Sequence, residues 1–444
     1  MTVATAQNLK REISGFDASM IVVSGVIGGG IFFTPAVVAQ RLPSAPLILL
    51  AWAVGALISY AGALTYAELA ARYPEAGGHY AYIRNAFGRL WGFLYGWMLL
   101  LIIATGALAS LALAFAGYLS AYIPLSPMQQ KLTAILLIAA LSVVNVFGVK
   151  PGARTTTLLT VIKVLAFALL IAVGLFVAPS QPPSFVVDAP PNSLLLAFGM
   201  ALVPILFSYG GWQQLNFMAG EVQDARRRIP AALALGVGVV AIVYVGLNVV
   251  YLRALGPAGM AESNALAADA GIMLLGEGAG RLITLLVTVS ILAFSNVVVM
   301  ATPRVFWAMS QDGSFLRSIA ALHPRYGTPA RAIGLQAGWA IVLVLIGNIG
   351  ALVNGVVFAD WIFFGLGAAS IFVLRRDDGH SGYRVPGYPV VPAFFVLAAI
   401  AAVVSAILAY PKESGLGALM LLVGALLFHW KYRASKTAVA AGVD

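Results

Sequence analysis

The chain has 444 residues, of which 61% are hydrophobic and only 9% are charged, and its formal net charge is +10. Soluble domains average roughly 45–50% apolar and about 25% charged residues, so this composition excludes an ordinary water-soluble enzyme. Uncharged stretches of the roughly 20 residues that a spanning helix needs recur along the chain, which predicts an all-α polytopic membrane protein.

Charges, prolines and turn residues divide the chain into twelve predicted membrane spans. The stretch to Gly15 is polar, and the apolar segment after it lacks a small-residue cleavage site, so we expect no signal peptide. The expected spans are 17–38, 47–71, 88–122, 132–149, 156–178, 194–220, 231–252, 282–310, 332–349, 352–374, 390–410 and 415–432.

The basic residues favour one orientation of these spans. With both termini in the cytoplasm, 20 of the 26 Lys and Arg residues lie in cytoplasmic segments, as the positive-inside rule requires. We therefore expect a multi-pass protein of the cell (inner or plasma) membrane with both termini cytoplasmic. Lys163 falls inside a span, and the other five cations lie outside: Arg41, Lys131, Arg253, Arg281 and Lys412.

The first span contains a glycine run. Residues 24–32 read SGVIGGGIF, with four glycines among six consecutive residues. Glycine destabilises a regular helix, so we expect the helix to be discontinuous there.

The fifth span contains a lysine, Lys163, in the stretch TVIKVLAF at 160–167. One interpretation is a lysine near a helix end whose ammonium reaches the lipid headgroups. The other is a buried ammonium beside a transport pathway. The residues alone leave both interpretations open.

The sixth span repeats the pattern of the first. Pro204 is followed by FSYGGW at 207–212, a second glycine interruption in an apolar run. Each interrupted span is the first of five, and an odd number of spans per half makes the halves inverted in the membrane. Close helix packing also explains glycines in a single span, but interruptions at matching positions point to a binding site near the midplane.

The repeat divides the chain into six predicted regions. Two five-helix repeats are joined by an extracellular connection and followed by two further spans, with a cytoplasmic tail at each end. In order, the regions are the N-terminal tail 1–16, the first repeat 17–178, the connection 179–193, the second repeat 194–374, the two further spans 375–432, and the C-terminal tail 433–444.

Two helix breaks suit a zwitterionic ligand. The N-terminus of a half-helix exposes N–H groups with partial positive charge, which suit a carboxylate. The free carbonyls opposite suit an ammonium. Together they predict a receptor for the backbone of an α-amino acid, which needs no charged side chain.

A few polar residues in the spans have both structural and functional interpretations. Glu68 and Glu221 lie at the cytoplasmic ends of spans two and six, where they either pair with arginines in an inner gate or are simply exposed. Asp360 in span ten either lines the cavity or caps a helix, and we favour the cap. Asn145 is expected to form a hydrogen bond between helices.

At these residues the chain resembles the amino acid/polyamine/organocation superfamily, and within it the bacterial L-type amino acid transporter and exchanger branch. The resemblance extends from about Ile13 to Tyr432. It rests on an ordered set of motifs: GVIGGGIFFTP at 25–35, YAELAARYPEAGGHYAYI at 66–83, FSYGGW at 207–212, GEV at 220–222, RIP at 228–230 and PRVFWAMSQDG at 303–313.

The resemblance implies a LeuT-type fold, five plus five inverted helices with two more appended, that works by alternating access. It places the substrate carboxylate at backbone N–H groups and the ammonium at backbone carbonyls, with an aromatic lid over the substrate. The implied residues are Gly28, Gly29 and Gly30 for the carboxylate, Val26, Phe207 and Ser208 for the ammonium, Gly210 for the space it needs, and Phe207 as the lid.

The chain departs from many relatives at Gly29, where they have a serine. The missing hydroxyl removes one hydrogen bond to the carboxylate, worth about 0.5–1.5 kcal/mol net. Lys163 matches the lysine that many members place where sodium-coupled relatives hold a sodium ion. A permanently charged Lys163 predicts a sodium-independent exchanger or uniporter, and a Lys163 that titrates predicts a proton symporter, which makes protons a partner.

The expected substrates are small or branched neutral amino acids, because the pocket around Phe207 and Ser208 is apolar. The alternatives are a cationic amino acid or polyamine transporter and, in a different class, a non-transporting membrane sensor or channel. No catalytic cluster is apparent, the four histidines are scattered and cysteine is absent, so we expect no enzyme activity, no metal, no cofactor and no disulfide-linked subunit. The net positive charge is explained by topology, so no nucleic acid is expected.

Overall fold

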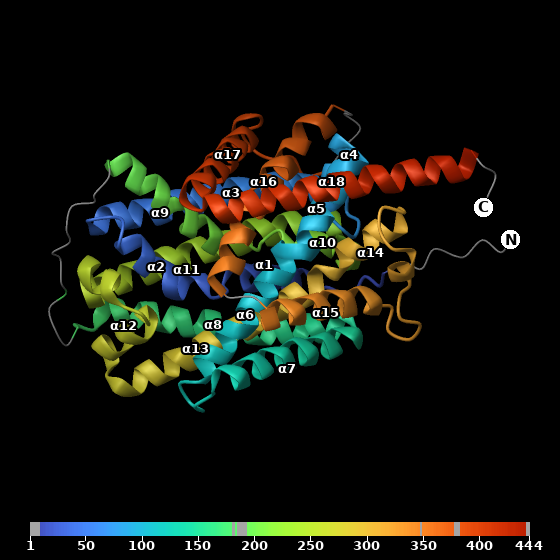
Figure 1. Cartoon of the computed structure of the whole chain (residues 1–444). Helices are drawn as coiled ribbons and strands as arrows, with labels where there is room; N and C mark the ends of the chain where they lie inside the picture. The colour runs from blue at the N-terminus through green and yellow to red at the C-terminus, as the bar shows by residue number, and fades with distance from the viewer. Residues whose placement is uncertain (1–8, 180–182, 184–192, 347–348, 377–381, 441–444) are drawn as a thin grey trace.

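The computed structural model describes residues 9–179, 183, 193–346, 349–376 and 382–440, with the side chains of 349–357 and 431–440 left out. This part of the chain forms a bundle of α-helices (Figure 1). Nine helices in it are long and apolar enough to cross a membrane. The protein is therefore an all-helical, multi-pass membrane protein.

Each expected span overlaps one helix or two consecutive helices. The N-terminal helices are α1 (Gly15–Val26), α2 (Gly30–Ala39), α3 (Ala45–Arg72), α4 (His79–Phe87), α5 (Arg89–Met98), which continues through a π-helical turn (Leu99–Ile103) into α6 (Ala104–Leu119), α7 (Pro127–Val146) and α8 (Val149–Phe176). The later helices are α9 (Leu194–Ser208), α10 (Gln214–Phe217), α11 (Ala225–Glu262), α12 (Leu266–Leu275), α13 (Glu277–Ala301), α14 (Pro303–Gln311), α15 (Ala330–Ile346), α16 (Ile349–Leu374), α17 (Val390–Ala409) and α18 (Pro411–Ala440).

Helix α11 is longer at both ends than the expected span 231–252. Pro230 lies near its start, where a missing backbone N–H costs little. At its other end the helical path continues past Arg253 to a kink at Gly256, whose φ of 69° an L side chain rarely adopts. A charge next to the membrane boundary therefore did not end this helix.

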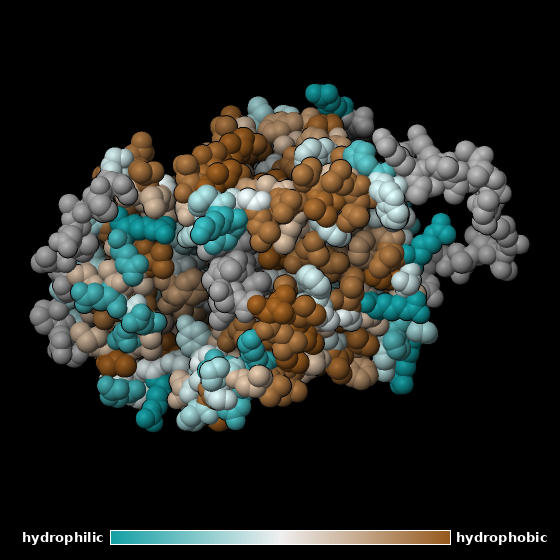
Figure 2. Space-filling model, viewed as in Figure 1, coloured by the Kyte–Doolittle hydropathy of each residue, from teal (hydrophilic) through white to brown (hydrophobic). Residues whose placement is uncertain are grey.

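Helix α8 has an apolar outer face and carries polar side chains in the middle of its buried face. The exposed side chains recur every three or four residues, which places them on one side of the helix. Since lipid is as apolar as leucine, this face needs no protein cover, and hydrophobic residues likewise spread over much of the surface in Figure 2. The exposed face carries Leu158, Ile162, Leu165 and Leu169, and the buried face carries Thr156, Thr160 and Lys163.

Buried amides join three helices beside α1. The Nδ2 group of Asn145 on α7 donates to Oδ1 of Asn296 on α13 at 2.7 Å, so the expected interhelical hydrogen bond is confirmed. Asn296 in turn donates from its own Nδ2 to Oγ1 of Thr156 on α8 at 2.9 Å. This network fixes α7, α8 and α13 against one another.

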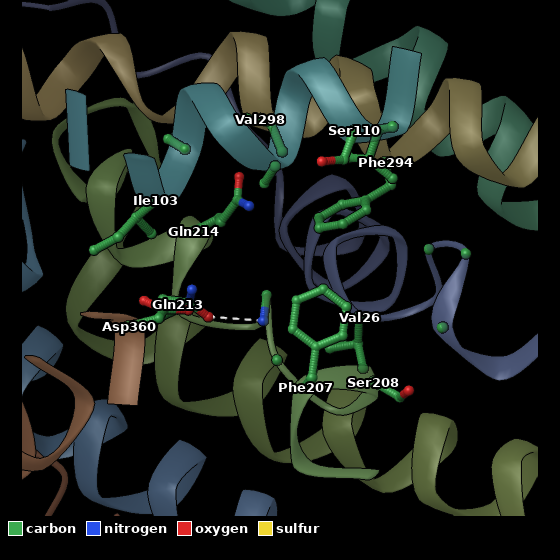
Figure 3. A pocket seen from close by; sticks show the side chains of 18 of the residues that line it. Val26, Ile103, Ser110, Phe207, Ser208, Gln213, Gln214, Phe294, Val298 and Asp360 are labelled. Carbon is green, nitrogen blue, oxygen red and sulfur yellow. Dashed lines mark hydrogen bonds between the residues drawn. The ribbon is translucent and has the colours of Figure 1, made fainter. Parts of the chain in front are cut away.

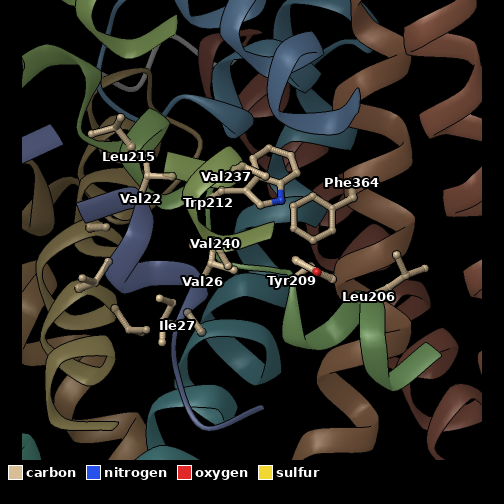
Figure 4. Packing of buried hydrophobic residues seen from close by; sticks show 14 of the residues in the cluster. Val22, Val26, Ile27, Leu206, Tyr209, Trp212, Leu215, Val237, Val240 and Phe364 are labelled. Carbon is tan, nitrogen blue, oxygen red and sulfur yellow. The ribbon is translucent and has the colours of Figure 1, made fainter. Parts of the chain in front are cut away.

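The centre of the bundle packs tightly around α1 and α9. Helix α1 contacts α8, α11 and α13, and α9 contacts α2 and α3. Beside them, the ring of Trp212 stacks on Phe364 of α16 at 5.5 Å between centroids (Figure 4). The rings of Trp52 and Tyr209 meet edge to face, with 5.7 Å between centroids. Large rigid side chains therefore hold the segment that follows α9.

Candidate functional site

The first helix is interrupted between α1 and α2. Helix α1 ends at Val26, Ile27 has a non-helical backbone (φ −76°, ψ 79°), and α2 begins at Gly30. The carbonyl of Ile27 accepts hydrogen bonds from Nζ of Lys163 at 2.6 Å and from Oγ of Ser290 at 3.0 Å. Side chains from α8 and α13 thus replace the helical N–H group that the break removes.

The two ends of this break carry opposite partial charges. Helix α2 has 10 residues, and Gly29 at its N-cap position provides no side-chain cap for the first N–H groups. These N–H groups lie at the positive end of the α2 dipole. The last carbonyls of α1 lie at the negative end of the α1 dipole. Among those carbonyls, Val26 accepts a hydrogen bond from Oη of Tyr244 at 2.9 Å.

The second break follows α9. Helix α9 ends at Ser208, and Gly211 has φ +107°, a conformation that favours glycine. The backbone N–H of Gly210 donates to the carbonyl of Phe207 at 3.1 Å, and that of Gly211 donates to Oε1 of Gln213 at 2.9 Å. A short helix, α10, then begins at Gln214. The chain therefore turns sharply without leaving these donors unpaired.

The two breaks touch each other through glycine. A Cβ atom added to Gly25 would lie 2.7 Å from the carbonyl oxygen of Gly211, and one added to Gly211 would lie 1.9 Å from the carbonyl oxygen of Gly25. Likewise, a Cβ on Gly30 would lie 2.5 Å from Oγ of Ser208. Side chains at these positions would force the two segments apart.

A cavity of about 180 Å³ lies at this junction (Figure 3). It is smaller than the roughly 300–1,000 Å³ of pockets for drug-sized ligands, and most of its lining is apolar. All seven residues expected to hold the substrate line it: Val26, Gly28, Gly29, Gly30, Phe207, Ser208 and Gly210. The structure thus brings these residues together from two segments about 180 residues apart, and their role in binding stays a prediction.

Lys163 lies behind the break rather than in the cavity lining. Its side chain is fully buried, so the interpretation as a lysine reaching the headgroups is wrong. Besides Ile27, its ammonium donates to Oγ of Ser24 at 3.2 Å and to the Ser24 carbonyl at 3.5 Å. These described partners are all uncharged groups of α1 and of the break.

Sequence reasoning missed two residues that organise the breaks. Tyr244 on α11 donates through its hydroxyl to the carbonyls of Val26 at 2.9 Å and Ser208 at 3.3 Å, so it joins the two segments. Ser290 on α13 reaches the carbonyls of Ile27 and Gly28. Both lie in long apolar runs, where no local pattern distinguishes them from packing residues.

Asp360 lines the cavity, so the favoured interpretation as a helix cap is wrong. It lies well inside α16, which begins at Ile349, and a cap requires a position at the helix start. Gln213 and Gln214 line the same cavity. In Figure 3 these three side chains lie on one side of the pocket, and Phe207 and Ser208 lie on the other.

Glu221 and Glu68 are buried in ion pairs, so the interpretation as exposed residues is wrong for both. Arg304 binds Glu221 with two bonds, of 2.7 Å from Nε and 2.9 Å from Nη2. Glu68 accepts from Arg72 at 2.7 Å, and Arg375 lies 3.5 Å away. These pairs tie α3 to the end of α16, and the segment after α10 to α14.

A third ion pair joins α4 to the end of α14. Asp312 accepts hydrogen bonds from Tyr80 and from Arg84. Burial acts to raise the pKa of the Asp312 carboxyl, but hydrogen bonds from Tyr80, Arg84 and Ser314 outweigh it, so the pKa lies below its ordinary value of 3.8. In Figure 1, α4 and α14 lie at the same end of the bundle as both chain termini.

Comparisons with known proteins agree over nearly the whole chain. Residues 13–428 match the amino acid permease family. The serine/threonine exchanger SteT of Bacillus subtilis (strain 168) is 29% identical, over 95% of this chain and 97% of that protein. The cystine/glutamate transporter of Homo sapiens is 31% identical over 94% of this chain and 84% of that protein. The b(0,+)-type amino acid transporter 1 of Mus musculus is 27% identical, over 96% and 88%.

Proposed function

The chain belongs to the amino acid permease family, the relatives named above are transporters or exchangers and not enzymes, and on this premise we propose a sodium-independent exchanger of small or branched neutral amino acids. The observation that carries the proposal is the junction of two helix breaks at one amino-acid-sized cavity. A solute held between two broken helices is accessible from either side by rearrangement of the helices around it, which is alternating access.

In this proposal the substrate backbone is held by main-chain groups. The carboxylate binds the N–H groups of Gly28, Gly29 and Gly30 at the start of α2. The ammonium binds the carbonyls of Val26, Phe207 and Ser208. Each carbonyl oxygen has two lone pairs, so the carbonyl of Ser208 can accept from the substrate and from Tyr244 together. The carbonyl of Val26 accepts from Tyr244 and from the N–H of Gly28 in this structure, so it gains a lone pair for the ammonium when that N–H turns to the substrate carboxylate. Gly210 leaves space, and Phe207 covers the substrate.

The proposed architecture is a LeuT-type pair of inverted five-helix repeats, 17–178 and 194–374, followed by two helices. It is supported by the matching positions of the breaks, α1–α2 opening the first half and α9–α10 the second. An even number of spans also agrees with the two termini lying at one end of the bundle (Figure 1). The excess of Lys and Arg in the segments expected at that end supports placing it on the cytoplasmic side of a cell membrane.

Lys163 serves in this proposal as a fixed cation. An ammonium that bonds to Ile27 and Ser24 supplies the positive charge that a sodium ion would otherwise supply beside the first break. A second candidate is proton symport through the same amine, which the uncharged character of its described partners favours. An isolated buried charge is costly, and losing a proton removes that cost.

The apolar lining supports neutral substrates, since Ile103, Phe294 and Val298 make up much of the cavity wall. Serine and threonine, carried by SteT according to its name, belong to this class. The alternative is a cationic amino acid, and the observation in its favour is the carboxyl group of Asp360 in the cavity. Neither substrate requires a cofactor or a disulfide-linked subunit.

Liposomes containing the purified protein test the proposal. Uptake of radiolabelled alanine and leucine is measured with and without unlabelled amino acid inside, with and without external sodium, and with and without an inward proton gradient. The Lys163→Ala protein is measured beside the wild type. Exchange predicts uptake that internal amino acid stimulates and that neither sodium nor the proton gradient changes.

Two results would overturn exchange. Gradient-driven uptake into empty vesicles, lost in Lys163→Ala, would identify a proton symporter. An absence of saturable amino acid flux together with ion conduction would identify a channel and remove the transporter proposal altogether.

A further inference from the structure

One side of the cavity carries hydrogen-bond acceptors that the protein does not pair. Gln214 is buried, with 8% of the residue exposed, and its Oε1 atom accepts no hydrogen bond. Asp360 lines the same cavity, and no described residue donates a hydrogen bond to its carboxyl group or forms an ion pair with it. The neighbouring Gln213 differs, because its Oε1 is occupied by the N–H of Gly211.

No described residue of the surrounding wall donates a hydrogen bond to Oε1 of Gln214. The lining on this side, Ile103 among it, is largely apolar (Figure 3). The two serines labelled on the opposite side both donate elsewhere, Ser110 to the carbonyl of Gly106 within its own helix, and Ser208 to Oγ1 of Thr34 and the carbonyl of Pro204. Water can serve the oxygens of Gln214 and Asp360 while the cavity is open. When the cavity closes around a substrate and water leaves, the substrate itself must supply the donor.

We propose that the wall formed by Gln214 and Asp360 is a side-chain subsite that selects small amino acids carrying a hydroxyl donor. The inference rests on the proposed function, which places the substrate backbone at the breaks on the other side of the cavity. A site built from acceptors rejects an isostere that lacks the donor, since its buried oxygens then stay unpaired. The small cavity favours a short side chain.

Threonine and valine provide the test, because they differ by a hydroxyl in place of a methyl group. The measurement is the concentration of each that halves uptake of labelled alanine into proteoliposomes. The thermal shift that each produces in the purified protein provides a readout of binding without transport. We expect threonine to act at a concentration about tenfold lower than valine, the factor expected for one net hydrogen bond.

Three variants locate the effect. In Gln214→Met and Asp360→Leu the threonine-to-valine ratio should fall to about one or two. In Gln336→Met the ratio should stay unchanged, because this glutamine is also buried with an unpaired Oε1 but does not line the cavity. For a variant that transports poorly, the threonine-to-valine ratio is taken from the thermal shifts. If a variant fails to fold, the ratio measured on the wild type tests the proposal by itself.

The Asp360→Asn variant tests whether the subsite instead selects a cationic substrate side chain, because it removes the charge and keeps an acceptor. Ornithine acting far better than threonine on the wild type, and losing that advantage in Asp360→Asn, would overturn the hydroxyl assignment. Equal action of threonine and valine on the wild type, while alanine is transported, would overturn the subsite and leave the proposed function standing. No uptake and no thermal shift with any amino acid would overturn both.

Discussion

The Nζ atom of Lys163 lies 2.6 Å from the carbonyl oxygen of Ile27, so a lysine on α8 completes the hydrogen bonding of a break in α1. Ser290 on α13 reaches the same oxygen at 3.0 Å. A charged donor and a neutral donor therefore converge on one carbonyl from two helices that pack against the broken helix. The conformation of the break depends on both.

Replacing the charged donor should cost more than replacing the neutral one. A hydrogen bond that involves a charged group is worth about 1.5–3 kcal/mol, against about 0.5–1.5 kcal/mol for a neutral one. Lys163→Met should therefore reduce amino acid uptake by about tenfold or more, and Ser290→Ala by less. Initial uptake rates in proteoliposomes, normalised to inserted protein, show which of the two variants loses more activity. A larger loss in Ser290→Ala would contradict it.

A serine at Gly29 should strengthen substrate binding. The atoms nearest to an added Cβ lie 3.7 Å and 3.9 Å away, in Phe33 and Ile291, and the backbone is in the right-handed helical region, so the side chain fits. One further hydrogen bond to the carboxylate, about 0.5–1.5 kcal/mol, predicts a KM about two- to tenfold lower. Gly29→Ala is the matched control, because it adds the carbon without the hydroxyl. A KM that falls equally in both variants would assign the gain to packing.

A methyl group at Gly25 should separate the two breaks. Its Cβ would lie 2.7 Å from a backbone oxygen of Gly211, which cannot rotate away as a side chain can. Overpacking of this kind costs about 1–3 kcal/mol, so Gly25→Ala should unfold at a lower temperature and lose transport. Gly117→Ala is the control, since its Cβ would meet nothing within 4 Å. Equal unfolding temperatures of the two variants would show that the contact between the breaks relaxes freely.

The pair formed by Glu221 and Arg304 should tolerate double replacement better than single replacement. Both side chains are almost fully buried, and removing one partner leaves an uncompensated charge, at a cost of about 3–5 kcal/mol. Glu221→Gln should therefore lower the thermal unfolding temperature sharply. Adding Arg304→Met to it should restore part of the loss. A double variant less stable than Glu221→Gln would show that Arg304 stabilises the fold by other contacts.

The half-buried Asp312 should stabilise the fold at pH values above the ordinary pKa of its carboxyl group, and this stabilisation should be lost at low pH. Its folded-state pKa lies below the ordinary value of 3.8, so its stabilising effect is present above pH 4 and lost as the pH falls through the folded-state pKa. The difference in unfolding temperature between wild type and Asp312→Asn should be constant from pH 5 to 7 and shrink toward pH 3. A difference that grows on acidification would contradict the direction of the pKa shift.

The helices and the candidate glycines could be predicted because their signals are local. Uncharged runs mark the helices, and the glycines at 25–30 and 210–211 mark places where a helix ends and backbones approach. Helix α12 was not predicted as a separate element, since its ten residues are too few to resemble a span. Helix α4 was also missed, because its nine residues are too few and too polar to resemble a span.

The sequence by itself determined that this is a polytopic helical membrane protein, and it identified the residues of two interrupted segments, because apolar length and glycine content act along the chain. Only the tertiary structure decided what those segments meet. Ile27 is bonded by residues 136 and 263 positions away, and Tyr244, Asp360 and Gln214 gain their significance from helices that fold around the breaks. A carbonyl or carboxyl group has the same sequence signature whether it is paired, solvated or aimed into a cavity, and packing alone distinguishes these cases.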